Sequence, residues 1–137
     1  MNPLVARLSF ASFSVDDIQK TLHEGKSLKN RDLEGINLSQ KALECADLNG
    51  AILIGANLSQ TNLSSANLQG ADLRRANLRS GNLKRANLQN SYLYRAVLCG
   101  CDLSEAQLDG AKVQLALYDS QTIWPEGYDY RNSGAVG

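Results

Sequence analysis

The chain has 137 residues, 43% of them hydrophobic, and its 14 basic and 14 acidic side chains give a formal net charge of zero. This length indicates a single domain, and no apolar stretch reaches the length of a membrane-spanning helix. Its three cysteines are an odd number, which argues against a disulfide framework and favours a cytoplasmic location. An exported or lumenal protein is the alternative if a targeting segment has been removed.

The N-terminal segment, residues 1–13, reads MNPLVARLSFASF. It lacks the basic start and the long apolar centre of a secretory signal. We interpret it as a lead-in to the element that follows. Residues 1–25 are therefore predicted to form an N-terminal lead-in and helical cap.

Residues 14–25 predict a short helix. Ser14 is placed to cap its N-terminus, with Asp17 completing a variant of the capping box. Gly25 suits the position at which a helix stops. One side of the helix is apolar and carries Val15, Ile18 and Leu22. We expect this side to cover the first unit of the repeat that follows, because stacked repeats need capping units at their ends.

A leucine recurs at every fifth position along most of the chain. From Ala46 on, a small residue, mostly alanine, stands two residues before each leucine, and the residue directly before the leucine is often Asn or Asp. Val113, Tyr118 and Ile123 continue the register after the last leucine. The unbroken series is Leu28, Leu33, Leu38, Leu43, Leu48, Leu53, Leu58, Leu63, Leu68, Leu73, Leu78, Leu83, Leu88, Leu93, Leu98, Leu103 and Leu108.

A five-residue period fits neither regular helix nor strand. On an α-helix each step of five turns the side chain by about 140°, which leaves no apolar stripe. On a strand the same step moves the side chain to the opposite face. The chain must therefore bend within each unit so that every leucine points to a shared axis. Such coils stack with their backbones about 4.8 Å apart, which predicts an all-β solenoid.

The repeat resembles the pentapeptide-repeat family, whose motif is A(D/N)LXX. ANLSQ, ANLQG, ADLRR, ANLRS and ANLQN match it as written, and the match runs from residue 26 to about residue 123. The resemblance implies a right-handed quadrilateral β-helix with four pentapeptides in each coil, hence about five 20-residue coils here. Lys26, Arg31 and Lys41 replace the expected alanine, so the first coil is predicted to be looser or partly open to solvent.

The C-terminal segment ALYDSQTIWPEGYDY resembles the closing segment of small members of cyanobacterial type. Tyr118, Ile123 and Trp124 are predicted to seal the last coil. Residues 26–125 are thus predicted to be the pentapeptide-repeat β-helix with its C-terminal cap. Residues 126–137 are predicted to be a tail, of which 131–137 have nothing to bury and should be loose.

The sequence offers no catalytic constellation, and we predict that the protein is not an enzyme. His23, the single histidine, has no evident partner. Cys99, Cys101 and Asp102 are close in sequence, but a tetrahedral zinc site needs four well-placed ligands, and Cys101 should point inward while Cys45 and Cys99 point outward. We therefore expect no metal and no cofactor.

One surface feature is a basic belt between residues 71 and 95, where Asp72 is the only acidic residue. One 20-residue circuit visits all four sides, so the belt should wrap the rod, whereas nucleic-acid binders concentrate charge on one face. Plain solvated surface and a site for an anionic partner both remain open. The belt comprises Arg74, Arg75, Arg79, Lys84, Arg85 and Arg95.

A second surface feature is apolar and aromatic. Positions flanking the core leucines should point outward, and some carry large apolar residues: Ile52, Ile54, Tyr92, Tyr94, Val97 and Leu117. Aromatic residues and arginine are enriched at binding hot spots, whereas Ile and Tyr also simply suit a pleated surface. Stacking residues 20 apart gathers a candidate interaction face of Ile52, Ile54, Arg74, Arg75, Tyr92, Tyr94 and Arg95.

The sequence therefore favours a non-enzymatic scaffold that binds an unidentified protein partner, or a second copy of the chain, through a flat face of the rod. A nucleic-acid-related role is the alternative. In it, the basic belt binds an anionic partner, or the rod mimics DNA and modulates a DNA-binding enzyme, as some members of the resembled family do. Zero net charge and a basic middle depart from that acidic mimic.

Overall fold

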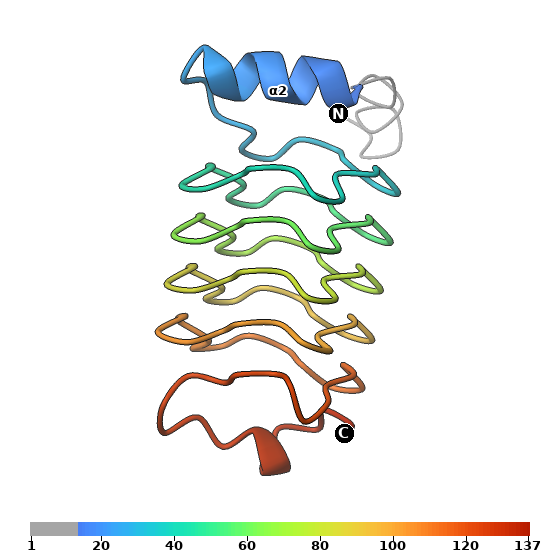
Figure 1. Ribbon diagram of the computed structural model, residues 1–137, viewed down its shortest axis with the longest axis vertical. Helices are drawn as coiled ribbons and strands as arrows, with labels where there is room; N and C mark the ends of the chain where they lie inside the picture. The colour runs from blue at the N-terminus through green and yellow to red at the C-terminus, as the bar shows by residue number, and fades with distance from the viewer. Residues whose placement is uncertain (1–13) are drawn as a thin grey trace, which may run out of the picture.

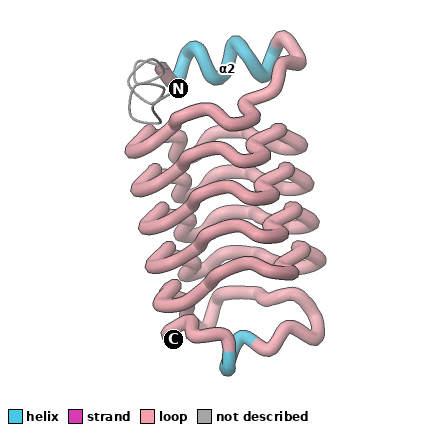
Figure 2. The backbone as a smooth tube through the Cα atoms, turned by 180° about the vertical axis from the view of Figure 1, so that it is seen from behind, coloured by secondary structure: helices cyan, strands magenta, loops and turns pink. Residues whose placement is uncertain are grey.

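The computed structural model describes residues 14–137 and shows a rod of stacked coils with one helix lying across its N-terminal end (Figure 1). The predicted lead-in at residues 1–13 lies outside the described residues. Seen from behind, the coils follow one another at even spacing until the last segment of the chain (Figure 2).

The N-terminal helix α2, Val15–His23, confirms the predicted cap. The Ser14 Oγ accepts a hydrogen bond from the Asp17 N–H at 3.1 Å, and the Asp17 carboxylate accepts one from the Ser14 N–H at 3.1 Å, so the capping box is complete. Gly25 follows the helix with a φ of 71°. Ile18 is fully buried against the leucine core, which shows that the helix covers the first coil.

The coils are joined by parallel β-bridges between residues 20 apart, arranged in four ladders. One ladder links Ile52, Asp72 and Tyr92, and the others run parallel to it on the remaining sides. Each bridge is isolated, so the predicted β-solenoid is built without longer named strands in the described residues. The four ladders confirm a four-sided coil of 20 residues, and the total of about five coils stays a prediction.

The leucine column forms the core, as predicted. Every leucine of the series from Leu28 to Leu103 is at most 2% exposed, and Leu108 at the C-terminal end is 7% exposed. The small residues two positions before them are buried beside the bends, including Thr61 and Ser91. Burying a leucine contributes roughly 1.5–3 kcal/mol, so the repeated column supplies the main stabilisation of a narrow rod.

Each corner of the coil uses a residue with left-handed backbone geometry two positions after the leucine. Glycine takes this geometry without strain, as at Gly55, but Arg75 and Arg95 also adopt it, with φ of 59° and 58°. The Asn or Asp before the leucine supports the corner: the Asn57 Oδ1 accepts the Ser59 N–H at 3.1 Å. These bonds explain why the motif prefers Asn or Asp at that position.

The C-terminal coil departs from the predicted register after Leu117. Asp102 pairs with Ile123, a spacing of 21, because one additional residue enters the turn at residues 119–122. Ile123 therefore points outward and is 52% exposed, and its predicted role in sealing the coil is wrong. Trp124 takes the inward place and packs against the core.

An aromatic cluster closes the C-terminal end. Trp124 stacks on Tyr128 and Tyr130 with ring centroids 5.4 Å apart in both pairs, and Tyr118 meets Trp124 edge-on at 5.5 Å. The predicted sealing roles of Tyr118 and Trp124 thus agree with the structure. The Trp124 Nε1–H is buried and has no hydrogen-bond partner among the described residues.

The loose C-terminus predicted for residues 131–137 is wrong. A short 3-10 helix, η1, spans Tyr130–Asn132. After it the chain rejoins the stack: Leu117 bridges to Val136, and the Gly134 carbonyl accepts the Leu115 N–H at 2.8 Å. The segment escaped prediction because it does not carry the five-residue motif, although Ala135 and Val136 fit the same small and outward positions.

Candidate functional site

The residues predicted for the interaction face stack in two neighbouring columns on one side of the rod. The bridges stack Ile52, Asp72 and Tyr92, and the pairings of the Gly55 N–H with the Arg74 carbonyl and of the Arg75 N–H with the Tyr94 carbonyl stack the neighbouring column. We call this surface the tyrosine face; it comprises Ile52, Ile54, Asp72, Arg74, Tyr92 and Tyr94, with Arg75 and Arg95 at its edge.

Exposure on the tyrosine face is highest at its C-terminal part. Tyr92 and Tyr94 are 43% and 38% exposed, while Ile52 and Ile54 are half-buried. The rings therefore stand out from a flatter apolar base. A partner that covers them would remove large aromatic area from water, which is the kind of contact that dominates protein interfaces.

Electrostatic contacts on the face were not foreseen from the sequence. The Arg74 guanidinium donates to both carboxylate oxygens of Asp72, at 2.8 and 2.6 Å. This hydrogen bonding raises the pKa of Arg74 above its usual value, and the pair is locally neutral. Position in the repeat shows that the two residues share a face, but only the side-chain rotamers show that they pair.

Two further cations lie over the tyrosine rings. The Arg95 guanidinium lies 5.4 Å from the Tyr94 ring centroid, and the Lys112 ammonium lies 4.9 Å from that of Tyr92. Such contacts orient a ring and contribute about 0.5–1 kcal/mol at exposed sites. Lys112 was missed as a site residue, although its position 20 residues after Tyr92 places it in the same column.

The basic belt wraps the rod as expected. Arg74 lies on the tyrosine face, and Arg79 and Lys84 follow on the next two sides, beside the ladders through Asn77 and Asn82. Arg85 approaches Glu105 at 3.8 Å. Arg75 and Arg95 are stacked at one corner, and among residues 14–137 neither forms an ion pair with a carboxylate.

An apolar strip continues around that corner at the C-terminal end. Leu117 was foreseen as outward, and it is 45% exposed. Leu115 and Val136, at 40% and 45% exposed, were missed. Leu115 could have been found from the register, since it follows Arg75 and Arg95 in the corner column, whereas Val136 was hidden in the supposed tail.

The cysteines occupy the positions expected from the repeat. Cys45 is exposed, Cys99 is half-buried and Cys101 is fully buried. The Cys101 thiol donates to the Leu78 carbonyl at 2.7 Å, and burial raises its pKa to about 12. It is therefore a neutral packing residue at physiological pH. No three His, Cys, Asp or Glu side chains within residues 14–137 are grouped so that they could hold a metal ion.

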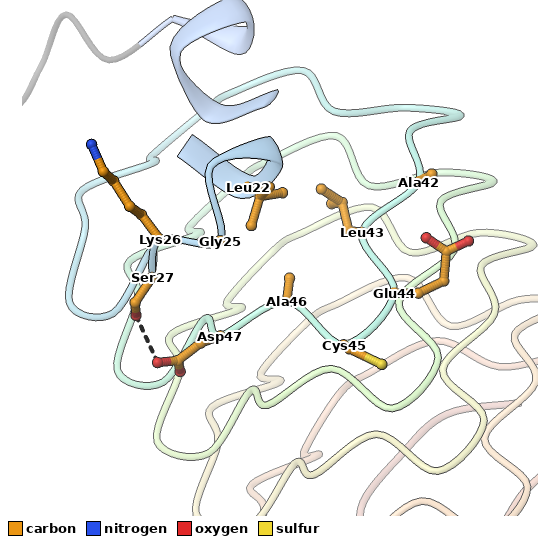
Figure 3. A pocket seen from close by; sticks show the side chains of 10 residues that line it. All are labelled: Leu22, Gly25, Lys26, Ser27, Ala42, Leu43, Glu44, Cys45, Ala46 and Asp47. Carbon is orange, nitrogen blue, oxygen red and sulfur yellow. Dashed lines mark hydrogen bonds between the residues drawn. The ribbon is translucent and has the colours of Figure 1, made fainter. Parts of the chain in front are cut away.

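A shallow pocket of about 340 Å³ lies between the end of α2 and the first coil. Leu22 and Leu43 both point into it, while Glu44 and Cys45 lie along its outer side (Figure 3). The Ser27 hydroxyl donates to Asp47 at 2.6 Å across one end. The pocket marks the junction between the helical cap and the coils.

Comparison with known proteins identifies the repeat. The family model for pentapeptide repeats matches eight copies, over residues 43–79 and 82–116. No curated protein matches the chain. None of the helices in the described part is long and apolar enough to cross a membrane.

Several solved structures share the fold. Rfr23, a pentapeptide repeat protein from the cyanobacterium Cyanothece 51142, is 41% identical with a TM-score of 0.60, and the match covers 69% of this chain and 61% of Rfr23. The pentapeptide repeat protein alr5209 from Nostoc Pcc 7120 is 29% identical with a TM-score of 0.52, over 89% of this chain and 93% of alr5209.

A plant structure is also similar. AT2G44920, a pentapeptide repeat protein from the Arabidopsis thaliana thylakoid lumen, is 26% identical with a TM-score of 0.57, and the match covers 64% of this chain and 65% of that one. The chain thus spans less than two thirds of Rfr23 and of AT2G44920.

Proposed function

Since the chain belongs to the pentapeptide-repeat family, whose solved members are right-handed quadrilateral β-helices, we propose that it is a non-enzymatic scaffold that binds a protein partner through the tyrosine face. The observation that carries the proposal is the grouping of Tyr92 and Tyr94, both well exposed, above a half-buried isoleucine base on one side of the rod. Rigid aromatic side chains lose little conformational entropy on binding, so they suit this role.

The rest of the rod supports this assignment by contrast. The side that precedes the tyrosine face carries Asn67, Gln69, Asn87 and Gln89 in the corresponding positions. These amides are half-buried, and the Asn67 and Asn87 side chains already accept the backbone N–H groups of Gln69 and Gln89, so a partner would gain little by covering them. The tyrosine face therefore differs from its neighbour in chemistry, while both share the same backbone geometry.

Capture from a lysate of the native host tests the proposal. Immobilised wild type should retain a partner that the double variant Ile54→Glu, Tyr94→Glu loses, because two carboxylates would have to be desolvated in the interface. The matched control is Asn49→Glu with Gln89→Glu, at the same positions of the neighbouring side. Equal capture by all three proteins would refute the tyrosine face as the binding surface.

Self-association through the same face is a second form of this proposal, in which the partner is a copy of the chain. Sedimentation of wild type should then give a concentration-dependent mass that the double variant Ile54→Glu, Tyr94→Glu abolishes. A monomer at all concentrations would leave a different protein as the partner.

An anionic partner, nucleic acid or acidic protein, is the second candidate. Its support is the stacked corner of Arg75 and Arg95, which no carboxylate of residues 14–137 neutralises through an ion pair. Binding driven by phosphate contacts weakens steeply with salt. Arg75→Glu with Arg95→Glu should abolish it, while the control Arg85→Glu should not. The DNA-mimic form of this candidate rests on the family resemblance alone.

A further inference from the structure

The last coil leaves part of its backbone unpaired, beginning with the side that carries residues 106–110. On this side, each leucine N–H of the earlier coils donates to a carbonyl 19 residues ahead: Leu68 to Asn87 and Leu88 to Gln107, at 2.8 and 2.9 Å. Leu108 is the next in this series, and its N–H has no hydrogen-bond partner in the described part of the chain.

Two more backbone groups on this side lack partners. The corner N–H groups of Gly70 and Asn90 donate to the next coil, but that of Gly110 donates to none of the described residues. The Ala86 carbonyl accepts the Gln107 N–H at 3.0 Å, whereas the Ala106 carbonyl accepts no hydrogen bond from residues 14–137. We call the Leu108 and Gly110 N–H groups and the Ala106 carbonyl the open edge.

Two of the other three sides of the last coil are paired, whereas on the third side the Val113 N–H and the Ala111 carbonyl have no hydrogen-bond partner in the described residues. Ile123 continues one ladder and Val136 another, and pairing with the terminal segment resumes at Leu115. Residues 125–128 instead leave the even spacing of the coils above them (Figure 1). The Tyr128 N–H turns back to the Pro125 carbonyl at 3.1 Å, so this loop cannot complete the open edge.

A groove of about 560 Å³ separates the open edge from this loop. Its walls are residues 106–111 on the coil side and 125–128 on the loop side. The volume lies within the range of about 300–1,000 Å³ that is usual for ligand sites. A whole second rod cannot reach the edge by stacking end to end, because η1 projects beyond it (Figure 1). An extended segment one strand wide has no such obstacle.

The lining of the groove indicates what that segment carries. Asp109 and Glu126 are exposed acidic residues in the lining, which contains no basic residue. Leu108 is 7% exposed and Tyr128 is half-buried, so an apolar surface lies at the bottom. A strand that continues the register of the rod, in which every bridge is parallel, runs parallel to residues 106–110 and meets all three backbone groups.

We infer that this groove binds an extended peptide segment of a partner protein, of the pattern small residue, polar residue, leucine, basic residue, by adding it as a parallel β-strand to the open edge. Exposed edges with unpaired donors and acceptors are templates for strand addition. In this register the peptide supplies two carbonyls to Leu108 and Gly110 and one N–H to Ala106. Its leucine lies over Leu108 and Tyr128, and its basic residue lies beside Asp109 and Glu126. The site is separate from the tyrosine face.

A synthetic peptide that copies residues 81–88 of this chain, GNLKRANL, fits the pattern and serves as the probe. Its binding to the full chain is measured by amide hydrogen exchange and by fluorescence anisotropy. At peptide concentrations up to about 2 mM, enough for even a weak complex, the Leu108 and Gly110 amides should become protected. The Leu68 and Leu88 amides, already paired, should not change.

The control peptide carries an N-methyl group on the backbone nitrogen of the residue copied from Asn82, which removes the donor for Ala106. It should bind about tenfold more weakly. Asp109→Lys with Glu126→Lys should weaken the original peptide several-fold, and Glu44→Lys at the other end of the rod should not.

Three results would overturn the inference. The first is no protection of Leu108 and Gly110 at the highest peptide concentration. The second is equal binding of the N-methylated peptide. The third is protection of both amides without peptide that rises with protein concentration, since a second copy of the chain would then occupy the edge.

Discussion

The two ends of the rod close the same stack of coils in different ways. At the N-terminal end, α2 satisfies its own backbone and presents one buried side chain, Ile18, to the core. At the C-terminal end, the chain shifts its register, and an aromatic cluster around Trp124 covers the leucines while backbone groups on two sides stay unpaired.

The difference follows from what each cap has to supply. A helix makes its hydrogen bonds internally, so it needs only an apolar stripe to cover a hydrophobic coil. A cap made from the last turn of the coil must pair its backbone with the coil before it on every side. Here that pairing fails beside residues 106–113. The N-terminal cap thus covers the leucines of its coil, whereas the C-terminal cap covers the core but leaves part of the backbone unpaired.

The largest expected loss of stability comes from a substitution in the core at the middle of the rod, away from both caps. Leu78 is fully buried between the caps, and Leu78→Asp would place an unpaired carboxylate in the core at a cost of several kcal/mol. We expect loss of the folded state by circular dichroism and thermal melting. Asn77→Asp, the outward neighbour, is the control and should melt like wild type. A Leu78→Asp protein that melts normally would refute the shared leucine core.

The next effect compares the two lids directly. Ile18→Ala should lower the free energy of unfolding by about 2–5 kcal/mol, because it leaves a cavity under α2. Ile123→Ala at the opposite end should change it by less than about 0.5 kcal/mol, since this side chain is 52% exposed. Denaturant melts measure both. Equal losses would mean that Ile123 seals the last coil after all, as the five-residue register predicted.

A smaller effect concerns the capping box of α2. Ser14→Ala should cost about 1 kcal/mol at neutral pH. Hydrogen bonds from the Ser14 N–H and hydroxyl hold the pKa of Asp17 below its usual value of 3.8. A lowered folded-state pKa stabilises the protein above the unfolded pKa, and this contribution is lost as pH falls through the folded value. The difference between wild type and variant should therefore shrink below about pH 4. The Ser14 N–H bond to the carboxylate remains in the variant, so a pH-independent difference would exclude the bond between the Ser14 hydroxyl and the Asp17 carboxylate.

Much of the fold follows from the sequence because one rule repeats. The leucine period places every core residue from Leu28 to Leu108, and spacing by 20 places Ile52, Tyr92 and their neighbours on one face. These relations depend only on counting residues. They hold wherever the chain neither gains nor loses a residue between coils.

The predictions from residue spacing fail where the chain leaves the regular repeat or where side-chain conformation decides the contact. One added residue at 119–122 turned Ile123 outward, and the return of Val136 to the stack after η1 carries no motif. On the tyrosine face, the pairing of Arg74 with Asp72 depends on rotamers rather than on register. The unpaired edge beside Leu108 could not be predicted either, because it depends on the path of residues 125–128, which do not carry the repeat motif.

The smallest expected change in the free energy of unfolding comes from a substitution of Trp124 in the C-terminal cap. The Trp124 Nε1–H is buried without a partner among residues 14–137, and an unsatisfied buried donor costs about 1–3 kcal/mol. Trp124→Phe removes that donor and keeps an aromatic ring between Tyr128 and Tyr118, so the gain offsets part of the lost contact area. We expect a change in the free energy of unfolding within about 1 kcal/mol, whereas Trp124→Ala should cost about 3–5 kcal/mol. Thermal and denaturant melts of the pair measure the difference. If Trp124→Phe is as damaging as Trp124→Ala, the indole N–H has a partner, and the C-terminal lid is as fully satisfied as the N-terminal one.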